Sequence, residues 1–128
     1  MFKKLLELQK KAFAPFSNYK VACIIETDNG NYSGVNIEPD VLNLGICAER
    51  NAIFNAITNG ATLVKKIYLL TDSKKSFGTP CGGCRQLLAQ FSNSDTIVFI
   101  YNINGDKVEH KLFDLLPMMW SKKDLKNE

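Results

Sequence analysis

Two short segments of the sequence contain residue types that bind metals or exchange electrons. Cys81 and Cys84 stand in a C-x-x-C spacing within "TPCGGCRQLL" (79–88), and Cys47 begins "CAER" (47–50). A C-x-x-C pair is typical of a redox dithiol, of half a structural zinc site, or of part of a catalytic metal site. The spacing alone leaves these three alternatives open.

The number of cysteines placed to bind a metal bears on that choice. Cys47, Cys81 and Cys84 stand at or near expected helix starts, where the helix dipole favours thiolate over thiol. Three thiolates would suit zinc and leave its fourth position for water, as in catalytic sites, whereas structural sites usually have four protein ligands. The fourth cysteine, Cys23, lies in the apolar run 21–25, and we expect it to be a buried small hydrophobic residue.

Two charged residues follow Cys47 closely. Glu49 is two positions further, and such neighbours point about 200° apart on an ideal helix, so spacing alone does not place its carboxylate beside a metal. It could reach the metal if Cys47 occupies the irregular first position; otherwise it is a helix-dipole or capping residue. Arg50 shares a helix face with Cys47 and could donate to its thiolate, or it could be an ordinary surface arginine.

Alternating helix and strand patterns must position these residues. The apolar spacing predicts helices over 2–14, 47–59 and 81–91, strands over 20–26, 31–37, 65–71, 96–101 and 107–110, and a brief helical turn over 112–116. Alanines 48, 52 and 56 form one stripe, which indicates a close neighbour, either a sheet or another subunit. The apolar run 96–101 suits a central strand covered on both sides. The order predicts an α/β fold with a mixed five-stranded sheet and helices on both faces, in a single domain over residues 1–128.

Composition and charge argue against several classes of partner. Of the 128 residues, 45% are hydrophobic and 23% are charged, and the formal net charge is +3. Because the lysines are scattered, no basic surface for nucleic acid is expected. No apolar run approaches the ~20 residues of a membrane span, and the first residues resemble an amphipathic helix, not a secretion signal. We therefore expect a cytoplasmic protein whose clustered cysteines serve a metal or catalysis.

The segments "CAER" (47–50) and "PCGGCRQ" (80–86) together resemble the cytidine deaminase family, in its small form with three zinc-binding cysteines. Further segments resemble the family in the right order, namely "APFSNYKVA" (14–22), "GVNIE" (34–38) and "LLP" (115–117) with an aromatic residue after it. The resemblance implies a three-layer α/β/α fold, one zinc ion per chain and a homotetramer with shared active sites. It also implies hydrolytic deamination of the nucleosides cytidine and deoxycytidine.

The resemblance assigns zinc binding to Cys47, Cys81 and Cys84. It assigns proton transfer to Glu49, between the attacking water, ring N3 of the cytosine and the leaving ammonia. Arg50 would then moderate the charge of the thiolates.

The resemblance also implies a nucleoside-binding set. Asn36 and Glu38 would bind the ribose hydroxyls, Tyr19 would lie near the base, and the backbone N–H of Ala48 would donate to the pyrimidine carbonyl. Trp120 would reach into a neighbouring subunit's site. Without the resemblance, Asn36 and Glu38 would be interpreted as ordinary polar residues at a strand end. The two aromatic residues would be interpreted as packing residues.

Departures from the family pattern keep other functions open. Pro39 stands where the family usually has Asn, and the aromatic residues 19 and 120 replace the more usual Phe. A near alternative is therefore a deaminase of another cytosine nucleoside, such as a nucleoside antibiotic. More distant alternatives are a redox protein that uses the C-x-x-C pair, and a non-catalytic zinc module closed by Cys23 or His110.

Overall fold

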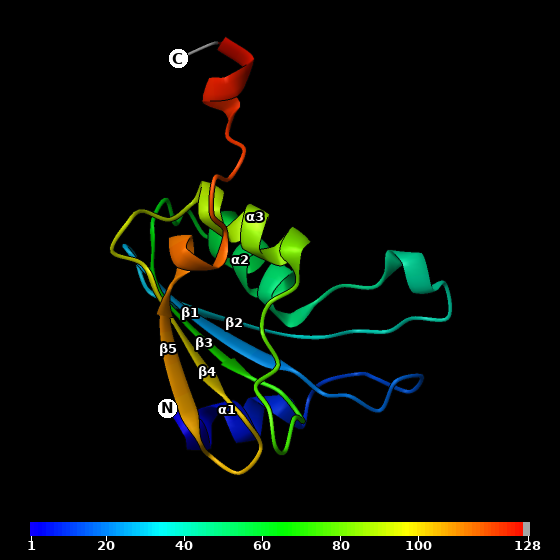
Figure 1. Ribbon diagram of the computed structural model, residues 1–128. Helices are drawn as coiled ribbons and strands as arrows, with labels where there is room; N and C mark the ends of the chain where they lie inside the picture. The colour runs from blue at the N-terminus through cyan, green and yellow to red at the C-terminus, as the bar shows by residue number, and fades with distance from the viewer. Residues whose placement is uncertain (127–128) are drawn as a thin grey trace.

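The computed structural model describes residues 1–126, and its centre is a sheet with the strand order β2-β1-β3-β4-β5. The strands are β1 (Ala22–Thr27), β2 (Asn31–Val35), β3 (Val64–Leu70), β4 (Ile97–Tyr101) and β5 (Lys107–Lys111). β3 and β4 run parallel, whereas the other neighbouring pairs are antiparallel. The predicted mixed five-stranded sheet is confirmed (Figure 1).

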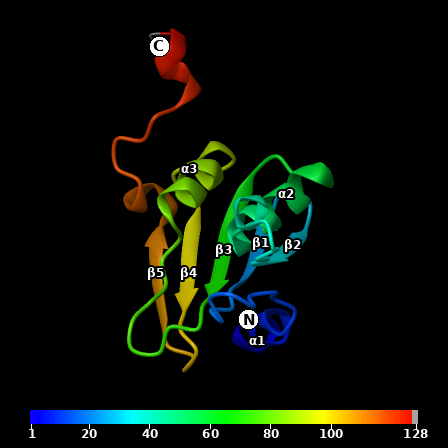
Figure 2. The same cartoon turned by 90° about the vertical axis from the view of Figure 1, so that its right-hand side faces the viewer.

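Helices cover both faces of the sheet. α2 (Ala48–Thr58) and α3 (Gly82–Gln90) lie side by side on one face, and α1 (Phe2–Gln9) lies on the other (Figures 1 and 2). Strand side chains alternate between the two layers: Cys23 and Ile25 pack with α2 and α3, whereas Ala22 packs with α1. This alternation gives the three-layer α/β/α arrangement that the sequence predicts.

The alanine stripe of α2 lies directly on the sheet. Ala48, Ala52 and Ala56 are fully buried. On β2, a Cβ added to Gly34 would lie only 2.7 Å from the carbonyl oxygen of Ala48. The helix therefore rests on bare strand backbone, which only glycine permits at this spacing. The close neighbour that the stripe indicated is the sheet.

Two expectations about elements were wrong in part. The first helix ends at Gln9 and not at residue 14, because Phe13 leaves the helical path and pairs with the chain beyond β2. Its N–H donates to the carbonyl of Asn36, and its own carbonyl accepts from Glu38 N–H, so tertiary hydrogen bonds prevail over the helical pattern. The apolar strand β4 is an interior strand between β3 and β5, but it is not fully covered on both sides, because Phe99 is only half-buried.

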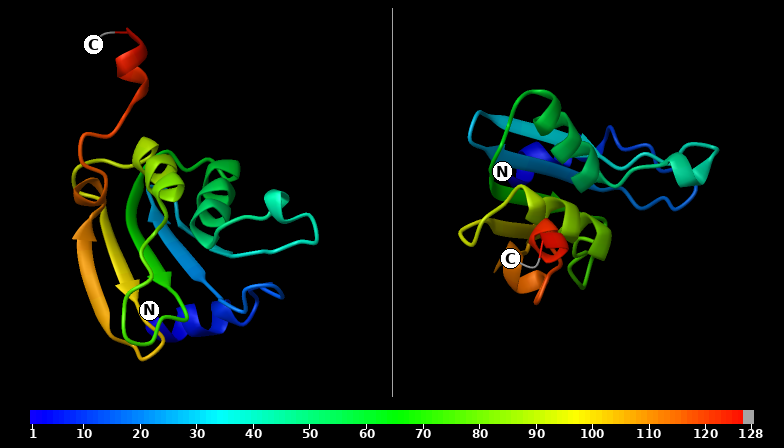
Figure 3. Two further views of the ribbon diagram at one scale, coloured as in Figure 1. Left: turned by 45° about the vertical axis from the view of Figure 1, so that its right-hand side comes forward. Right: turned by 90° about the horizontal axis from the view of Figure 1, so that it is seen from above.

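Short 3-10 segments complete the chain at Leu42–Leu44 (η1), Leu112–Leu115 (η2) and Lys122–Lys126 (η3). η2 is the brief helical turn that the sequence predicts, whereas η1 was not expected. η1 lies at the tip of a loop that extends from the body beside the loop before β1 (Figure 3). Within residues 1–126, no helix has both the length and the apolar character needed to cross a membrane.

Candidate active site

Three cysteines meet where two helices begin. Cys47 is the N-cap of α2 and Cys81 the N-cap of α3, and both have extended backbone conformations. Cys84 lies in the first turn of α3, and its N–H donates to the sulfur of Cys81 over 3.4 Å. Because α2 and α3 pack side by side, the three sulfur atoms all lie within 4.8 Å of one another.

The cluster fits a tetrahedral zinc ion. A Zn–S distance of ~2.3 Å places sulfurs about 3.8 Å apart, close to the 3.3 Å between the Cys81 and Cys84 sulfurs and within the 4.8 Å limit for the set. The pKa of Cys47 is lowered to about 5, chiefly by a hydrogen bond from Cys84, whose own pKa is raised because it holds that proton and is buried. A cation can replace the shared proton, and three sulfurs leave a fourth position open.

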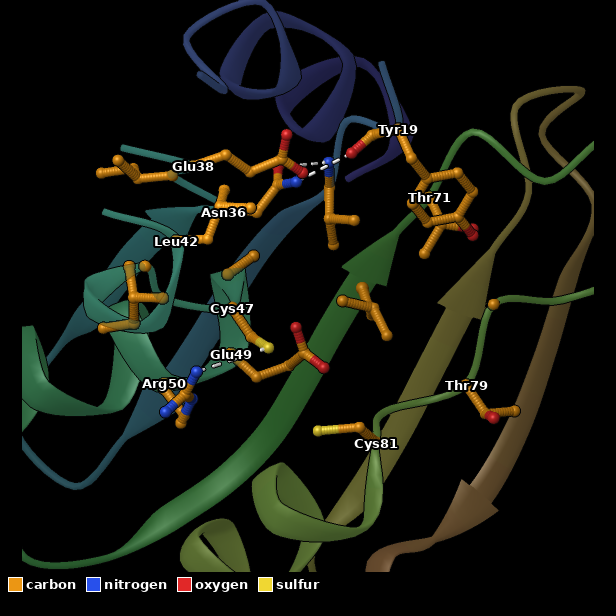
Figure 4. A pocket seen from close by; sticks show the side chains of 17 residues that line it. Tyr19, Asn36, Glu38, Leu42, Cys47, Glu49, Arg50, Thr71, Thr79 and Cys81 are labelled. Atoms are coloured by element: carbon orange, nitrogen blue, oxygen red, sulfur yellow. Dashed lines mark hydrogen bonds between the residues drawn. The ribbon is translucent and has the colours of Figure 1, made fainter. Parts of the chain in front are cut away.

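Glu49 faces the cluster despite its spacing. Figure 4 shows its carboxylate between the sulfurs of Cys47 and Cys81. Because Cys47 is an extended N-cap residue, the angular separation of an ideal helix does not apply. Glu49 is only 5% exposed, and burial, helped by the charge of Cys47, raises its pKa to about 7. Such a carboxyl can take up and release protons near neutral pH.

Arg50 approaches the same thiolate from the helix side. Its Nη2 donates to the sulfur of Cys47 over 3.8 Å (Figure 4). This contact holds the pKa of Arg50 above its usual value and contributes to lowering that of Cys47. Of the two roles that spacing left open, the geometry therefore favours the thiolate partner.

A cavity of about 390 Å³ extends from the cysteines to the loops before β1 and after β2. Its lining comprises Tyr19, Val21, Asn36, Ile37, Glu38, Leu42, Gly45, Ile46, Cys47, Ala48, Glu49, Arg50, Leu69, Thr71, Gly78, Thr79 and Cys81. The volume is within the range of small-molecule sites. We call the part formed by Cys47, Cys81 and Glu49, with the buried Cys84 beside it, the metal end, and the part formed by Tyr19, Asn36 and Glu38 the loop end.

Backbone contacts hold Asn36 in place at the loop end. Its Oδ1 accepts a hydrogen bond from the N–H of Val21 at 2.8 Å, and its Nδ2 donates to the carbonyl of Tyr19 at 2.7 Å. The residue directly follows β2, so it ties that strand to the loop before β1. Its side-chain orientation is set by protein groups before any ligand arrives.

Glu38 is held in a similar way. Its Oε1 accepts from the N–H groups of Phe16 and Ser17 at 3.1 and 3.0 Å, and its Oε2 accepts from the hydroxyl of Ser17. These hydrogen bonds, those from Ser17 above all, lower the pKa of Glu38. The carboxylate therefore stays ionised near neutral pH and is an acceptor, in contrast to Glu49.

The other predicted binding residues divide into two groups. Ala48 lines the cavity, and its N–H lies in the first turn of α2, where helical N–H groups have no partner within the helix. The ring of Tyr19 lies against Thr71 (Figure 4). Trp120 is not part of this cavity: it is 55% exposed, on a C-terminal segment that extends away from the sheet (Figure 1).

The two residues considered as a fourth ligand lie elsewhere. Cys23 is fully buried on β1, and burial raises the pKa of its thiol well above the usual value. His110 is exposed on β5. Among residues 1–126, the cluster of potential metal ligands around Cys47 contains only the three cysteines.

Sequence reasoning did not find several residues that line the cavity. Leu42 and Ile46 come from the loop around η1, and Thr71, Gly78 and Thr79 come from the segment between β3 and α3. These residues stand in no periodic pattern and in no motif with a chemical rationale. Their position depends on contacts between loops that are distant in sequence.

The fold and the three-sulfur site define a class of zinc-binding deaminases. Residues 1–100 match the family described as the cytidine and deoxycytidylate deaminase zinc-binding region. The chain belongs to this family, which confirms the resemblance found in the sequence.

Individual relatives are similar over nearly the whole chain. A cytidine deaminase of Mycoplasma genitalium is 35% identical over 116 residues, which cover 91% of this chain and 89% of the relative. A cytidine deaminase of Halalkalibacterium halodurans is 33% identical over 126 residues, which cover 98% of this chain and 95% of the relative. The crystal structure of cytidine deaminase from Burkholderia pseudomallei is 30% identical and covers 93% of this chain and 95% of its own, with a TM-score of 0.85. The likeness confirms the predicted fold.

Proposed function

We propose that the chain is a zinc-dependent cytidine deaminase. It would convert cytidine and deoxycytidine, with one water, to uridine and deoxyuridine plus one ammonia, a reaction of pyrimidine salvage. The observation that carries the proposal is the buried Glu49 carboxylate, which lines one cavity with Cys47 and Cys81, two members of the three-sulfur cluster. Membership of the zinc-binding deaminase family supports it. We further propose that residues 1–128 form one domain and act in the cytoplasm.

Cys47, Cys81 and Cys84 would hold one zinc ion per chain. Zinc, when bound, supplies a Lewis acid that makes a water molecule a nucleophile near neutral pH. Three thiolates carry more negative charge than the ion neutralises, which opposes that effect. Arg50, which donates to the sulfur of Cys47, withdraws part of the excess charge.

Glu49 would move the protons of the reaction. Its carboxylate takes a proton from the attacking water and delivers it to ring N3 of the cytosine. It then takes the remaining proton of that water from the hydroxyl now on C4 and passes it to the amino group, which leaves as ammonia while C4 becomes a carbonyl. The raised pKa of about 7 suits both directions of transfer, because neither protonation state is strongly favoured near neutral pH.

The loop end would bind the sugar and the base. Each polar atom of the Asn36 amide makes one hydrogen bond to backbone and keeps the capacity for a second, so a ribose hydroxyl can bind there. The Glu38 carboxylate accepts three bonds and has about four acceptor positions, which leaves room for a hydroxyl donor. The Tyr19 ring would lie near the base, and the Ala48 N–H would donate to the pyrimidine carbonyl.

Trp120 would act in a neighbouring subunit of a homotetramer. Its exposure, its absence from the lining of its own cavity and the course of the C-terminal segment away from the sheet (Figure 2) support this role. The test mixes chains that carry Trp120→Ala with chains that carry Glu49→Gln. If sites are shared, the mixed oligomers differ in activity from the mean of the separate oligomers; additive activity contradicts sharing.

The function is tested with zinc-loaded protein and a panel of cytosine nucleosides. Cytidine and deoxycytidine should each yield equal amounts of ammonia and deaminated nucleoside. Metal analysis with X-ray absorption should find one zinc per chain with three sulfurs and one exchangeable oxygen. Four protein ligands, or no turnover of any cytosine nucleoside, contradicts the proposal.

A second candidate function is deamination of a cytosine nucleoside with a modified sugar. Pro39, directly after Glu38 at the loop end, favours it, because the rigid ring constrains the segment that would contact the sugar. Turnover of sugar-modified cytosine nucleosides together with inert cytidine and deoxycytidine would select this second function.

A further inference from the structure

Two consecutive residues just before β1 bind two consecutive residues just after the neighbouring strand β3. The hydroxyl groups of Tyr19 and Ser73 lie 2.7 Å apart, within hydrogen-bond distance. The N–H of Lys20 donates to Oδ2 of Asp72, also at 2.7 Å. We call these four residues the clasp. Its halves are more than 50 positions apart in the sequence, so it exists only in the folded chain.

A buried glutamine supports the clasp from α1. The Nε2 of Gln9 donates to Oδ1 of Asp72 at 3.0 Å and to the carbonyl oxygen of Lys20 at 2.9 Å. Gln9 is only 7% exposed. Both oxygens of Asp72 are therefore engaged, Oδ1 by Gln9 of α1 and Oδ2 by the N–H of Lys20, and the contact is anchored to the helix layer beneath the sheet.

The clasp connects the two ends of the cavity. On one side, the carbonyl of Tyr19 accepts from the amide of Asn36, so the clasp reaches the loop end. On the other side, Ser73 belongs to the segment that runs from Thr71 at the end of β3 to Cys81 at the metal end. Thr71 and Cys81 both line the cavity. The clasp therefore joins a residue of the loop end to the segment that leads to the metal end.

Gly78 leaves space for the hydroxyl of Tyr19. A Cβ at this position would lie 2.5 Å from the Tyr19 oxygen and 2.5 Å from Oγ1 of Thr71. Any side chain at Gly78 would thus displace the tyrosine hydroxyl or the threonine. The absence of a side chain here keeps the clasp and the adjoining cavity wall packed together.

We propose that the clasp sets the width of the nucleoside pocket, and that Tyr19 is a positioning residue through its hydroxyl as well as a surface for the base. The inference rests on the proposed function for its substrate. The Tyr19–Ser73 bond holds the loop end at a fixed distance from the metal end, so the nucleoside enters a pocket that is already formed. Less ordering is then needed on binding.

The test compares two tyrosines that each lose one hydroxyl. Tyr19→Phe removes the clasp bond and keeps the ring, whereas Tyr32→Phe removes a bond of similar length, 2.9 Å to Oδ1 of Asn29, in the hairpin turn. Tyr19→Phe should raise KM for cytidine about fivefold, as expected for one net hydrogen bond, with a smaller change in kcat. Tyr32→Phe should leave KM unchanged. An equal effect of both variants, or no effect of Tyr19→Phe, overturns the proposal.

A double-mutant cycle tests whether the hydroxyls act together. Ser73→Ala should raise KM to the same extent as Tyr19→Phe, and the double variant should be no worse than either single one. Additive effects would overturn a shared role. Gly78→Ala should also raise KM, because the added Cβ would displace the Tyr19 hydroxyl or Thr71.

Hydrogen exchange separates this inference from the proposed function. In the zinc-loaded protein without substrate, Tyr19→Phe should accelerate exchange in residues 16–20 and in residues 72–79, whereas Tyr32→Phe should not. If cytidine is not a substrate, this measurement still decides whether the clasp orders both walls. Unchanged exchange in both segments, or faster exchange with unaltered KM in an active enzyme, overturns the role of the clasp.

Discussion

The metal end and the loop end of the cavity are built in different ways. At the metal end, Cys47, Cys81 and Cys84 stand in the first residues of two helices whose inner faces are fully buried on the sheet. At the loop end, Asn36 and Glu38 lie outside regular structure and are held by hydrogen bonds to residues 15 to 22 positions away. Local helix geometry organises the first end, and long-range loop contacts organise the second.

The carboxylates of the two ends differ accordingly. Burial raises the pKa of Glu49 to about 7, whereas the hydrogen bonds from Ser17 lower the pKa of Glu38. A buried carboxyl that gains and loses protons easily suits chemistry on the substrate. A permanently ionised carboxylate suits recognition of hydroxyl groups. The surroundings thus suit the same residue type to two different roles.

The largest effect is expected at the metal end. Glu49→Gln should lower kcat for cytidine by roughly 10²–10⁴-fold, because the amide cannot exchange protons with water and ring N3. Zinc content should stay at one per chain, because Glu49 is outside the three-sulfur cluster. Ammonia release and metal analysis on the same sample check both points. A kcat within tenfold of the wild type would remove Glu49 from the proton steps.

A smaller effect, on binding, is expected at the loop end. Glu38→Gln should raise KM about tenfold, because a charged acceptor is lost, with less change in kcat. Asp28→Asn is a matched control: Asp28 also accepts from two backbone N–H groups and one hydroxyl, those of Thr62 and Leu63, but it does not line the cavity. Steady-state kinetics of the two variants compare them. Similar rises in KM would mean that loop order in general, and not the Glu38 carboxylate, controls binding.

Cys23 tests whether the metal end is limited to three sulfurs. Cys23→Ala should cost about 1 kcal/mol of unfolding free energy through lost packing, and zinc should remain at one per chain. Cys84→Ala, the control at another buried cysteine, should abolish stoichiometric zinc binding. Denaturant titration and metal analysis measure the two effects. Loss of zinc from Cys23→Ala would indicate a fourth protein ligand and a structural site.

The smallest effect is expected on the pH dependence of stability, at Asp28, which lies outside both ends of the cavity. The hydrogen bonds from Thr62 and Leu63 lower the pKa of Asp28 to about 2, below the ~3.9 of an unfolded chain. The ionised carboxylate therefore stabilises the fold above about pH 4, and this contribution is lost as the pH falls toward 2. Metal-free wild type should exceed metal-free Asp28→Asn in urea midpoint at pH 7, and the difference should shrink below pH 4. A difference independent of pH would contradict this assignment.

The predicted elements were most accurate where they depend on local pattern. The five strands and the helices α2 and α3 lie within one or two residues of their predicted bounds. Except in β5, which is mostly exposed, their apolar pattern agrees with their burial. The first helix was predicted too long, because Phe13 forms backbone bonds with the chain around Asn36 and Glu38. The local sequence pattern around residues 2–14 cannot predict these hydrogen bonds, because the partners lie more than 20 positions away.

For the active site, the sequence by itself contains the candidate donor set: three cysteines at expected helix starts, which the family resemblance assigns to one zinc ion, with Glu49 and Arg50 close in the chain. Only the tertiary structure decided that Glu49 faces the sulfurs, since this depends on the extended conformation of Cys47. The positions of the residues in the loop end and in the clasp also follow only from the tertiary structure, because the hydrogen bonds that hold them join segments far apart in sequence. Residue types and short spacings are encoded locally, whereas the shape of the cavity is a property of the folded chain.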